Sequence, residues 1–155
     1  MRNPFQGRSL SIIIATLGPV GYIPKAPGTF GTLAAIPLFF LFSKTNIYLQ
    51  LILILFLIII SVWASSRAGE LFQNLDDPRI VIDELVGYLV ATFGISFNIW
   101  SVLFSFVIFR FFDVLKIYPI SLIDSRWRTG VGVVADDIIA GVFTNIIIHL
   151  ALWLF

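Results

Sequence analysis

Long apolar runs separated by short polar segments are the dominant pattern along this chain. The runs cover residues 9–17, 30–43, 47–65, 85–109 and 138–155. A membrane-spanning α-helix needs about 20 apolar residues, with a range near 17–25. The run at 47–65 therefore predicts a spanning helix, whereas the run at 9–17 is too short to span. The 14-residue run at 30–43 predicts a short, tilted or re-entrant helix.

The run at 85–109 is compatible with one long tilted helix or with two shorter helices broken near residues 94–98. The positive-inside rule separates the two, because cytoplasmic loops carry an excess of Lys and Arg. With a break, nine of the ten basic residues lie on one side of the membrane and only Lys44 lies on the other. With a single helix the division is five to five. We therefore predict a helical hairpin at 85–112.

The hairpin also gathers the acidic residues. All nine Asp and Glu residues then share a side with the nine basic residues, so 18 of the 19 charged side chains lie on one membrane face. A conducting pathway usually needs polar groups along its depth, and the apolar runs contain few. The pattern favours a protein whose chemistry takes place at one interface.

Composition agrees with a membrane protein. Of the 155 residues, 59% are hydrophobic and 12% are charged, and the mean hydropathy is +1.00, whereas soluble domains carry about 25% charged residues. A net charge of +1 gives no electrostatic case for a nucleic-acid partner. Cysteine is absent, which excludes disulfides and thiolate metal sites. We predict a single domain over residues 1–155, folded as an all-α, polytopic membrane helical bundle of about four to five short or spanning helices.

Four polar clusters stand at predicted helix ends on the charged face. The first contains Gly28, Thr29, Gly31 and Thr32 after a proline-rich loop. A helix that begins there presents free N–H groups and a positive dipole end, which suit a phosphate. Simple capping of the helix by Thr29 or Thr32 explains the same residues.

The second and fourth clusters are acidic pairs, Asp83–Glu84 and Asp136–Asp137, each at the mouth of an apolar run. Acidic residues favour helix N-termini through the macrodipole. An unpaired carboxylate beside an apolar span is costly, however, and two such pairs are harder to explain in this way than one.

Glycines accompany both acidic pairs. Gly87 lies one turn after Glu84 and lets another helix approach closely. Gly130 and Gly132 predict a glycine turn that leads into a helix opening with the second acidic pair.

The third cluster places Arg110, Asp113 and Lys116 at every third residue, on one helical face. Two i,i+3 ion pairs, worth about 0.2–0.5 kcal/mol each, would account for this spacing. Alternatively, Asp113 is a metal ligand and the two cations hold phosphate oxygens.

Together the clusters supply five carboxylates: Asp83, Glu84, Asp113, Asp136 and Asp137. Five negative charges at one interface repel one another unless cations neutralise them. Carboxylate oxygens are ligands for hard divalent cations, and Mg²⁺ commonly uses one or two of them together with a substrate phosphate. Zn²⁺ is not expected without cysteine or a nearby histidine, and His149 is expected to be a packing or interfacial residue.

Four segments carry a further signal when they are taken in order. They are Pro-Gly-Thr-Phe-Gly-Thr at 27–32, Val-Ile-Asp-Glu-Leu-Val-Gly at 81–87, Phe-Arg-Phe-Phe-Asp-Val-Leu-Lys at 109–116 and Gly-Val-Gly-Val-Val-Ala-Asp-Asp at 130–137. In this order and spacing they resemble the phosphatidylglycerophosphatase A family. The resemblance extends from about Ala15 to Gly141.

The resemblance implies an all-helical enzyme that removes the terminal phosphate from phosphatidylglycerol phosphate and requires Mg²⁺. It also implies a multi-pass location in the bacterial inner membrane, with the active site facing the cytoplasm and membrane lipids as neighbours. The site hypothesis is therefore as follows. Catalysis is assigned to Asp83, Glu84, Asp113, Lys116, Asp136 and Asp137, metal binding to the five carboxylates among them, and phosphate binding to Thr29, Thr32, Arg110 and Lys116.

Two other functions are compatible with parts of the pattern. Phosphoalcohol transfer from a nucleotide-lipid donor also uses intramembrane aspartates, but it expects a longer Asp-and-Gly motif on adjacent helices, which is not visible. A small membrane transporter or a non-enzymatic membrane subunit predicts polar residues deep in the spans, where Thr92, Thr144, Asn145 and a few serines qualify. The oligomeric state is not indicated.

Overall fold

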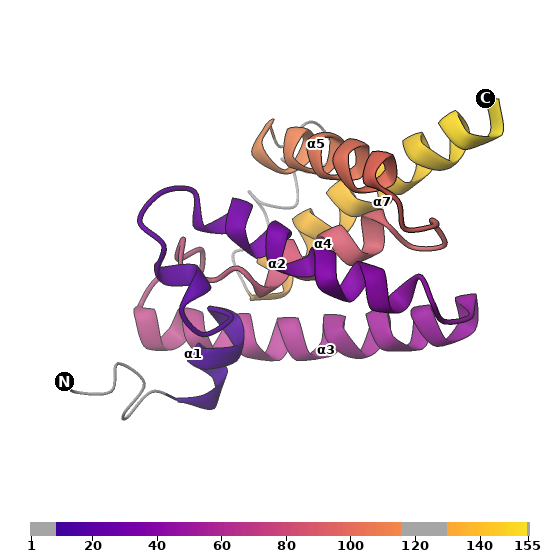
Figure 1. Cartoon of the computed structure of the whole chain (residues 1–155). Coiled ribbons are helices and arrows are strands. Elements are labelled where there is room, and N and C mark those ends of the chain that lie inside the picture. Colours follow the sequence, from indigo (N-terminus) through magenta and orange to yellow (C-terminus); the bar gives the residue numbers. More distant parts are fainter. Residues whose placement is uncertain (1–8, 116–129, 155) are drawn as a thin grey trace.

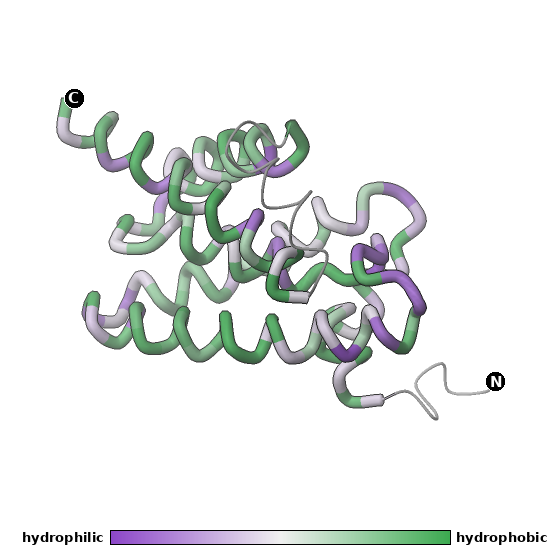
Figure 2. Tube along the Cα trace, turned by 180° about the vertical axis from the view of Figure 1, so that it is seen from behind, coloured by the Kyte–Doolittle hydropathy of each residue, from purple (hydrophilic) through white to green (hydrophobic). Residues whose placement is uncertain are grey.

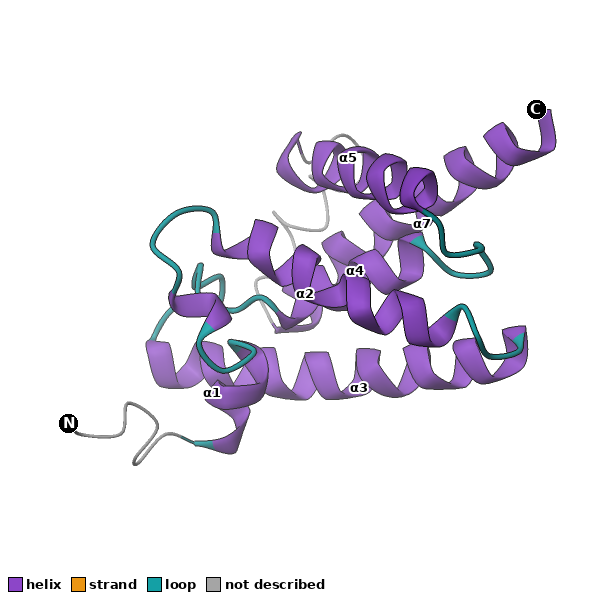
Figure 3. Cartoon of the chain, viewed as in Figure 1, coloured by secondary structure: helices purple, strands orange, loops and turns teal. Residues whose placement is uncertain are grey.

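The computed structural model describes residues 9–115 and 130–154, in which helix is the only regular secondary structure (Figures 1 and 3). The all-α class is therefore confirmed. The helices are α1 (Leu10–Ala15), the 3₁₀ turn η1 (Val20–Tyr22), α2 (Pro27–Phe42), α3 (Ile47–Phe72), α4 (Ile82–Ala91), α5 (Ile99–Leu115) and α7 (Gly130–Leu154).

The described residues contain six α-helices, whereas about four to five were predicted, and the short α1 accounts for the difference. Within the described residues, α3 and α7 are the helices that are long and apolar enough to cross a membrane. Their 26 and 25 residues correspond to about 39 and 38 Å of helix. The apolar α2 is shorter, with 16 residues. The number of membrane crossings stays a prediction.

The apolar run at 85–109 is broken, as the charge distribution predicted. Helix α4 ends at Ala91, Gly94 adopts a positive φ of 71°, and α5 begins at Ile99. The Tyr88 hydroxyl on α4 lies 2.9 Å from the Ser105 hydroxyl on α5, which brings the two helices side by side. The hairpin is therefore observed, with helices that begin and end a few residues outside 85–112.

The two ends of the helical bundle differ in how many charged residues they carry. Figure 1 shows the N-terminal ends of α2 and α4 and the C-terminal ends of α3 and α5 gathered at one end of the molecule. We call this the charged end. The α2–α3 and α4–α5 connections and the C-terminal end of α7 lie at the opposite end, and hydrophilic segments concentrate at the charged end (Figure 2). Among the described residues, Lys44 is the charged side chain on a connection at the opposite end.

Polar side chains at the opposite end satisfy the backbone where α4 stops. The Asn145 side-chain amide on α7 donates to the carbonyls of Ala91, at 3.1 Å, and Phe93, at 2.8 Å. The His149 Nε2 atom lies 3.1 Å from the same Phe93 carbonyl. In an apolar environment each unsatisfied backbone group costs several kcal/mol, so these contacts let α4 end inside the helical bundle.

Glycine sets the crossing of α4 and α7. A Cβ atom added to Gly87 would lie 2.7 Å from the Asp137 carbonyl oxygen and 2.9 Å from Phe109 Cζ, and Gly141 packs in turn on the Gly87 carbonyl. The close helix approach predicted at Gly87 is therefore confirmed. It places the acidic pair of α7 beside the first turn of α4.

The predicted turn at Gly130–Gly132 is wrong, because α7 already begins at Gly130. A Cβ atom added to Gly130 would lie 2.6 Å from the Cα atom of Ser66. Close packing of α7 on α3 therefore requires this glycine. As a result, Asp136 and Asp137 lie in the second turn of α7 and do not open the helix.

Candidate active site

A pocket of about 280 Å³ lies at the charged end. Its walls come from the loop before α4 and the first turn of α4, from the last two turns of α5, and from the first two turns of α7. The charged residues that line it are Asp76, Asp77, Asp83, Glu84, Arg110, Asp113, Asp136 and Asp137. All five carboxylates singled out in the sequence therefore converge on one cavity.

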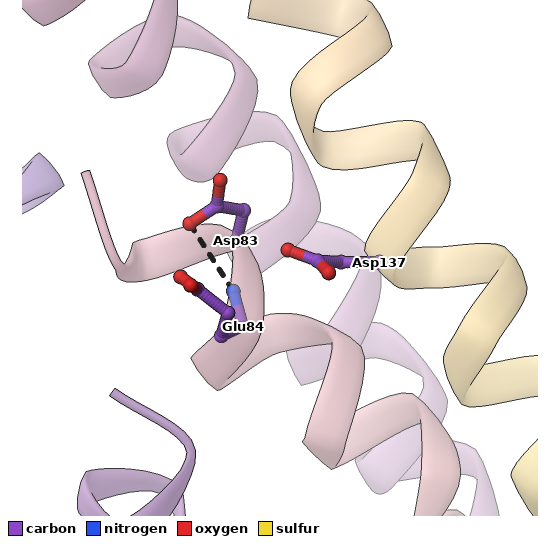
Figure 4. Close-up of side chains that lie close together, drawn as sticks. All are labelled: Asp83, Glu84 and Asp137. Atoms are coloured by element: carbon purple, nitrogen blue, oxygen red, sulfur yellow. Dashed lines mark hydrogen bonds between the residues drawn. The ribbon is translucent and has the colours of Figure 1, made fainter. Parts of the chain in front are cut away.

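Three of these carboxylates form the centre of the pocket. Oxygen atoms of Asp83, Glu84 and Asp137 all lie within 4.8 Å of one another. Figure 4 shows the three side chains pointing toward one another, two from the start of α4 and one across from α7. The Asp83 carboxylate also accepts the Glu84 backbone N–H at 3.2 Å. This bond fixes one Asp83 oxygen and leaves the group oriented toward its neighbours.

Burial makes this arrangement costly without a counter-charge. Asp83 and Glu84 lie in the first turn of α4, outside the two helices long enough to span a membrane. Burial and the neighbouring Glu84 carboxylate raise the pKa of Asp83 well above its usual range. Burial also raises the pKa of Glu84 to about 6. The Glu84 Oε2 atom is buried and has no hydrogen-bond partner among the described residues.

The three carboxylates fit a hard divalent cation. Each offers an oxygen atom, the donors are close enough to share one ion, and a buried oxygen without a partner is available. Mg²⁺ is typically held by one or two carboxylates together with substrate oxygens and water. The donor set therefore suits Mg²⁺ better than Zn²⁺, which prefers histidine and cysteine.

Arg110 brings a positive charge to the same pocket. Its guanidinium forms an i,i+3 ion pair with Asp113, and both side chains are largely buried, with 19% and 15% of their surface exposed. The Arg110 Nε atom is buried and has no hydrogen-bond partner within the described part of the chain. Arg110 therefore keeps a donor for an anion that enters the pocket. Lys116, the other predicted cation, lies outside the described residues.

The predicted phosphate-binding threonines do not line the pocket. Thr32 is fully buried, and its hydroxyl donates to the Gly28 carbonyl at 3.0 Å. Thr29 is half-buried on the first turn of α2. The part of α2 that contacts Glu84 is the Gly28 backbone. A phosphate-binding role for Thr29 and Thr32 stays a prediction.

Asp76 and Asp77 line the pocket, although the sequence analysis gave them no role. Asp77 accepts two side-chain hydrogen bonds from Arg79, at 2.7 Å from Nε and 2.8 Å from Nη2. These bonds lower the pKa of Asp77. The signal available in the sequence was an acidic pair in the loop that leads directly into Asp83.

Fold and pocket together define a helical protein with membrane-length apolar helices and a buried acidic site at their charged end. Comparison with known families identifies it further. Residues 13–152 match the family model described as Phosphatidylglycerophosphatase A, so the chain belongs to the phosphatidylglycerophosphatase A family. The resemblance seen in the four sequence segments is thereby confirmed.

Individual relatives agree with this family. A protein of Escherichia coli named phosphatidylglycerophosphatase A is 34% identical over 130 residues, covering 83% of this chain and 76% of the relative. One of the same name from Haemophilus influenzae is 32% identical, covering 83% and 80%. A Bacteroides thetaiotaomicron protein, provisionally named phosphatidylinositol-3-phosphatase, is 32% identical over 152 residues, covering 93% and 94%. No solved structure matches the chain.

Proposed function

We propose that this chain hydrolyses the terminal phosphomonoester of phosphatidylglycerol phosphate, giving phosphatidylglycerol and inorganic phosphate. Family membership and the names of the two phosphatidylglycerophosphatase A relatives support this reaction. The structural observation that carries the proposal is the convergence of Asp83, Glu84 and Asp137, whose oxygens lie within 4.8 Å of one another.

The proposed cofactor is Mg²⁺. Asp83, Glu84 and Asp137 would hold it, and Asp113 and Asp136 line the same pocket. When bound, Mg²⁺ polarises a phosphoryl oxygen and lowers the pKa of a coordinated water.

Arg110 supplies the charge complement for the substrate. Its guanidinium, oriented by Asp113, offsets the negative charge that develops on the phosphoryl oxygens. Hydrolysis forms a bond from a water oxygen to phosphorus and breaks the bond from phosphorus to the glycerol oxygen of the headgroup. We favour direct attack by water, because the described lining of the pocket contains no cysteine or histidine.

The proposed location is the bacterial inner membrane, with several crossings and the charged end in the cytoplasm. Among the described basic residues, Lys25, Arg67, Arg79 and Arg110 belong to segments at the charged end and Lys44 to a connection at the opposite end, and such an excess is typical of the cytoplasmic side. Large apolar side chains are exposed along α3, including Ile52, Phe56 and Ile59, and membrane lipids would cover them. In this arrangement the acyl chains of the substrate stay in the bilayer and only the headgroup enters the pocket.

The hydrogen bonds made by polar residues deep in the helices favour an enzyme over a transporter. Thr92 and Thr144 donate their hydroxyls to carbonyls of their own helices, at 2.9 Å and 2.8 Å. Asn145 caps the broken end of α4. Thr92, Thr144 and Asn145 thus have structural partners, which argues against their lining a polar pathway of the kind that a transporter needs.

A second substrate is suggested by the provisional name of the Bacteroides thetaiotaomicron relative. Phosphatidylinositol 3-phosphate also carries a phosphomonoester on a lipid headgroup, so the same acidic pocket could act on it. A direct comparison of the two lipids decides between these substrates.

The test is phosphate release by purified protein in detergent, with each lipid, with and without Mg²⁺. Substitution of Asp83, Asp113 or Asp137 by Asn, or of Glu84 by Gln, is expected to lower turnover at least about 100-fold. Glu70→Gln is the matched control, because Glu70 is an exposed acid paired with Arg67. Normal turnover in the folded Asp83, Asp113 and Asp137 variants would rule out the proposed site.

A further inference from the structure

The start of α2 is set by its own backbone. Ala26 adopts a left-handed conformation with φ 52° and ψ 56°, and Pro27 is the first residue of the helix. Left-handed backbone costs an L-residue about 1–2 kcal/mol, and proline fixes φ near the helical value. The chain therefore enters α2 in a constrained direction. In this direction the first turn of α2 packs against Glu84 of the acidic pocket.

Gly28 is the point of contact. A Cβ atom added at this position would lie 3.0 Å from Cδ of Glu84 and 3.4 Å from Nη1 of Arg110, and it would overlap Glu84 Oε1. The Glu84 carboxylate therefore occupies the space that any side chain at position 28 would need.

Gly31 makes a second contact of the same kind, one turn further along α2. Its added Cβ would lie 2.8 Å from the carbonyl oxygen and 2.9 Å from Cβ of Val81. Val81 is the residue that precedes α4, and its N–H donates to the Ala15 carbonyl at 2.9 Å. Residues three apart share one face of a helix, so one face of α2 supports both Val81 and Glu84.

Hydrogen bonds hold the Glu84 carboxylate only in part. Within the described residues, Oε2 of Glu84 has no hydrogen-bond partner, and neither does Nε of Arg110 beside it. Packing against the Gly28 backbone therefore contributes to where the Glu84 carboxylate lies.

We propose that Gly28 and Gly31 are positioning residues, which hold the first turn of α4 so that Glu84 reaches the cation site shared with Asp83 and Asp137. This inference rests on the metal site of the proposed function. It gives the glycines of the 27–32 segment a role that differs from binding phosphate through the start of α2.

Manganese binding tests the proposal without substrate. Mn²⁺ is a paramagnetic substitute for Mg²⁺, and electron paramagnetic resonance measures its affinity for the purified protein in detergent. Gly28→Ala is expected to raise the dissociation constant for Mn²⁺ at least about tenfold, the scale seen when residues that orient a ligand are changed. Phe30→Leu is the matched control, because Phe30 lies on the same turn with its ring exposed, and its affinity is expected to equal that of the wild type.

A compensating variant separates positioning from a general effect on folding. Glu84→Asp shortens the side chain that overlaps the new methyl group, so Gly28→Ala/Glu84→Asp is expected to bind Mn²⁺ more tightly than Gly28→Ala. If Gly28→Ala does not fold, the double variant is expected to fold and bind. Loss of folding in both would overturn the proposal, because the glycine would then serve the fold alone.

The remaining outcomes are also decisive. Wild-type affinity in folded Gly28→Ala would overturn the positioning role and leave the proposed function intact. Absence of Mn²⁺ binding in the wild type would overturn the metal site, and the positioning role with it. Phosphate release from the lipid by the wild type tests the proposed reaction separately from both.

Discussion

Two arginines each neutralise one carboxylate that lines the pocket. The close group of carboxylates at the centre of the pocket is made of other residues. Arg110 pairs with Asp113, and Arg79 pairs with Asp77. Asp83, Glu84 and Asp137 form the close group that a divalent ion would have to neutralise. The paired carboxylates are therefore suited to shaping and orienting, and the close group to binding a metal.

The Asp77–Arg79 pair predicts a dependence of stability on pH. Arg79 bonds lower the pKa of Asp77 from its usual 3.8, so the pair stabilises the fold above that pH and loses its contribution as pH falls through the lowered pKa. Asp77→Asn is expected to lower the free energy of unfolding by about 1 kcal/mol at pH 7. A buried hydrogen bond between charged groups contributes somewhat more than this, and the partial exposure of Arg79 reduces that contribution. Thermal unfolding in detergent measures this cost.

The same scan at lower pH provides the check on Asp77. The difference between the wild type and Asp77→Asn is expected to shrink as pH falls below 3.8 and to vanish only below the lowered pKa, where the wild-type carboxyl is protonated in the folded state as well. Glu70→Gln is the control, because its ion pair with Arg67 is exposed, with 60% of the Glu70 side chain accessible, and such pairs contribute about 0–1 kcal/mol. A difference for Asp77→Asn that persists unchanged at low pH would contradict an ionic role.

At the scale of the helices, sequence patterns predicted the break between α4 and α5 and missed the start of α7. The break follows from counting basic residues, because only a hairpin keeps nine of the ten on one side. The start of α7 does not follow, because glycines at 130 and 132 are as typical of a turn as of a helix. The contact of Gly130 with Ser66, on a helix distant in the sequence, favours the helix over the turn. A single sequence does not reveal that contact.

The end of α4 gives a prediction about the elements. Asn145→Leu would leave the carbonyls of Ala91 and Phe93 without the side-chain amide, and an unsatisfied buried group costs about 1–3 kcal/mol. Thermal stability is expected to fall by this amount, whereas phosphate release per folded molecule is expected to stay normal, because the pocket lies at the charged end, away from Asn145. Ile146→Leu, an exposed neighbour, serves as the control. Unchanged stability in Asn145→Leu would show that the contact contributes nothing.

For the whole molecule, the sequence predicted that the acidic residues share one end, and the structure adds which of them meet. Asp137 reaches Asp83 and Glu84 because α7 crosses α4 at Gly87. Crossing geometry depends on packing between segments about 50 residues apart, which periodicity along the chain does not encode. The threonines of α2 illustrate the same limit. Their hydroxyl groups suit phosphate binding, yet the Thr32 side chain is buried in the core.

The orientation of the molecule in the membrane is open to a direct test, because the chain contains no cysteine. Single substitutions Lys44→Cys and Asn74→Cys place one thiol on the α2–α3 connection and one on the exposed loop after α3. In intact cells, a membrane-impermeant maleimide is expected to label Lys44→Cys, and to label Asn74→Cys only after the inner membrane is permeabilised. The reason is that α3, about 39 Å long, separates the two positions by more than the roughly 30 Å hydrocarbon core. Labelling of both thiols in intact cells would mean that α3 does not cross the membrane, and the acidic pocket would then lack the cytoplasmic position that its charges predict.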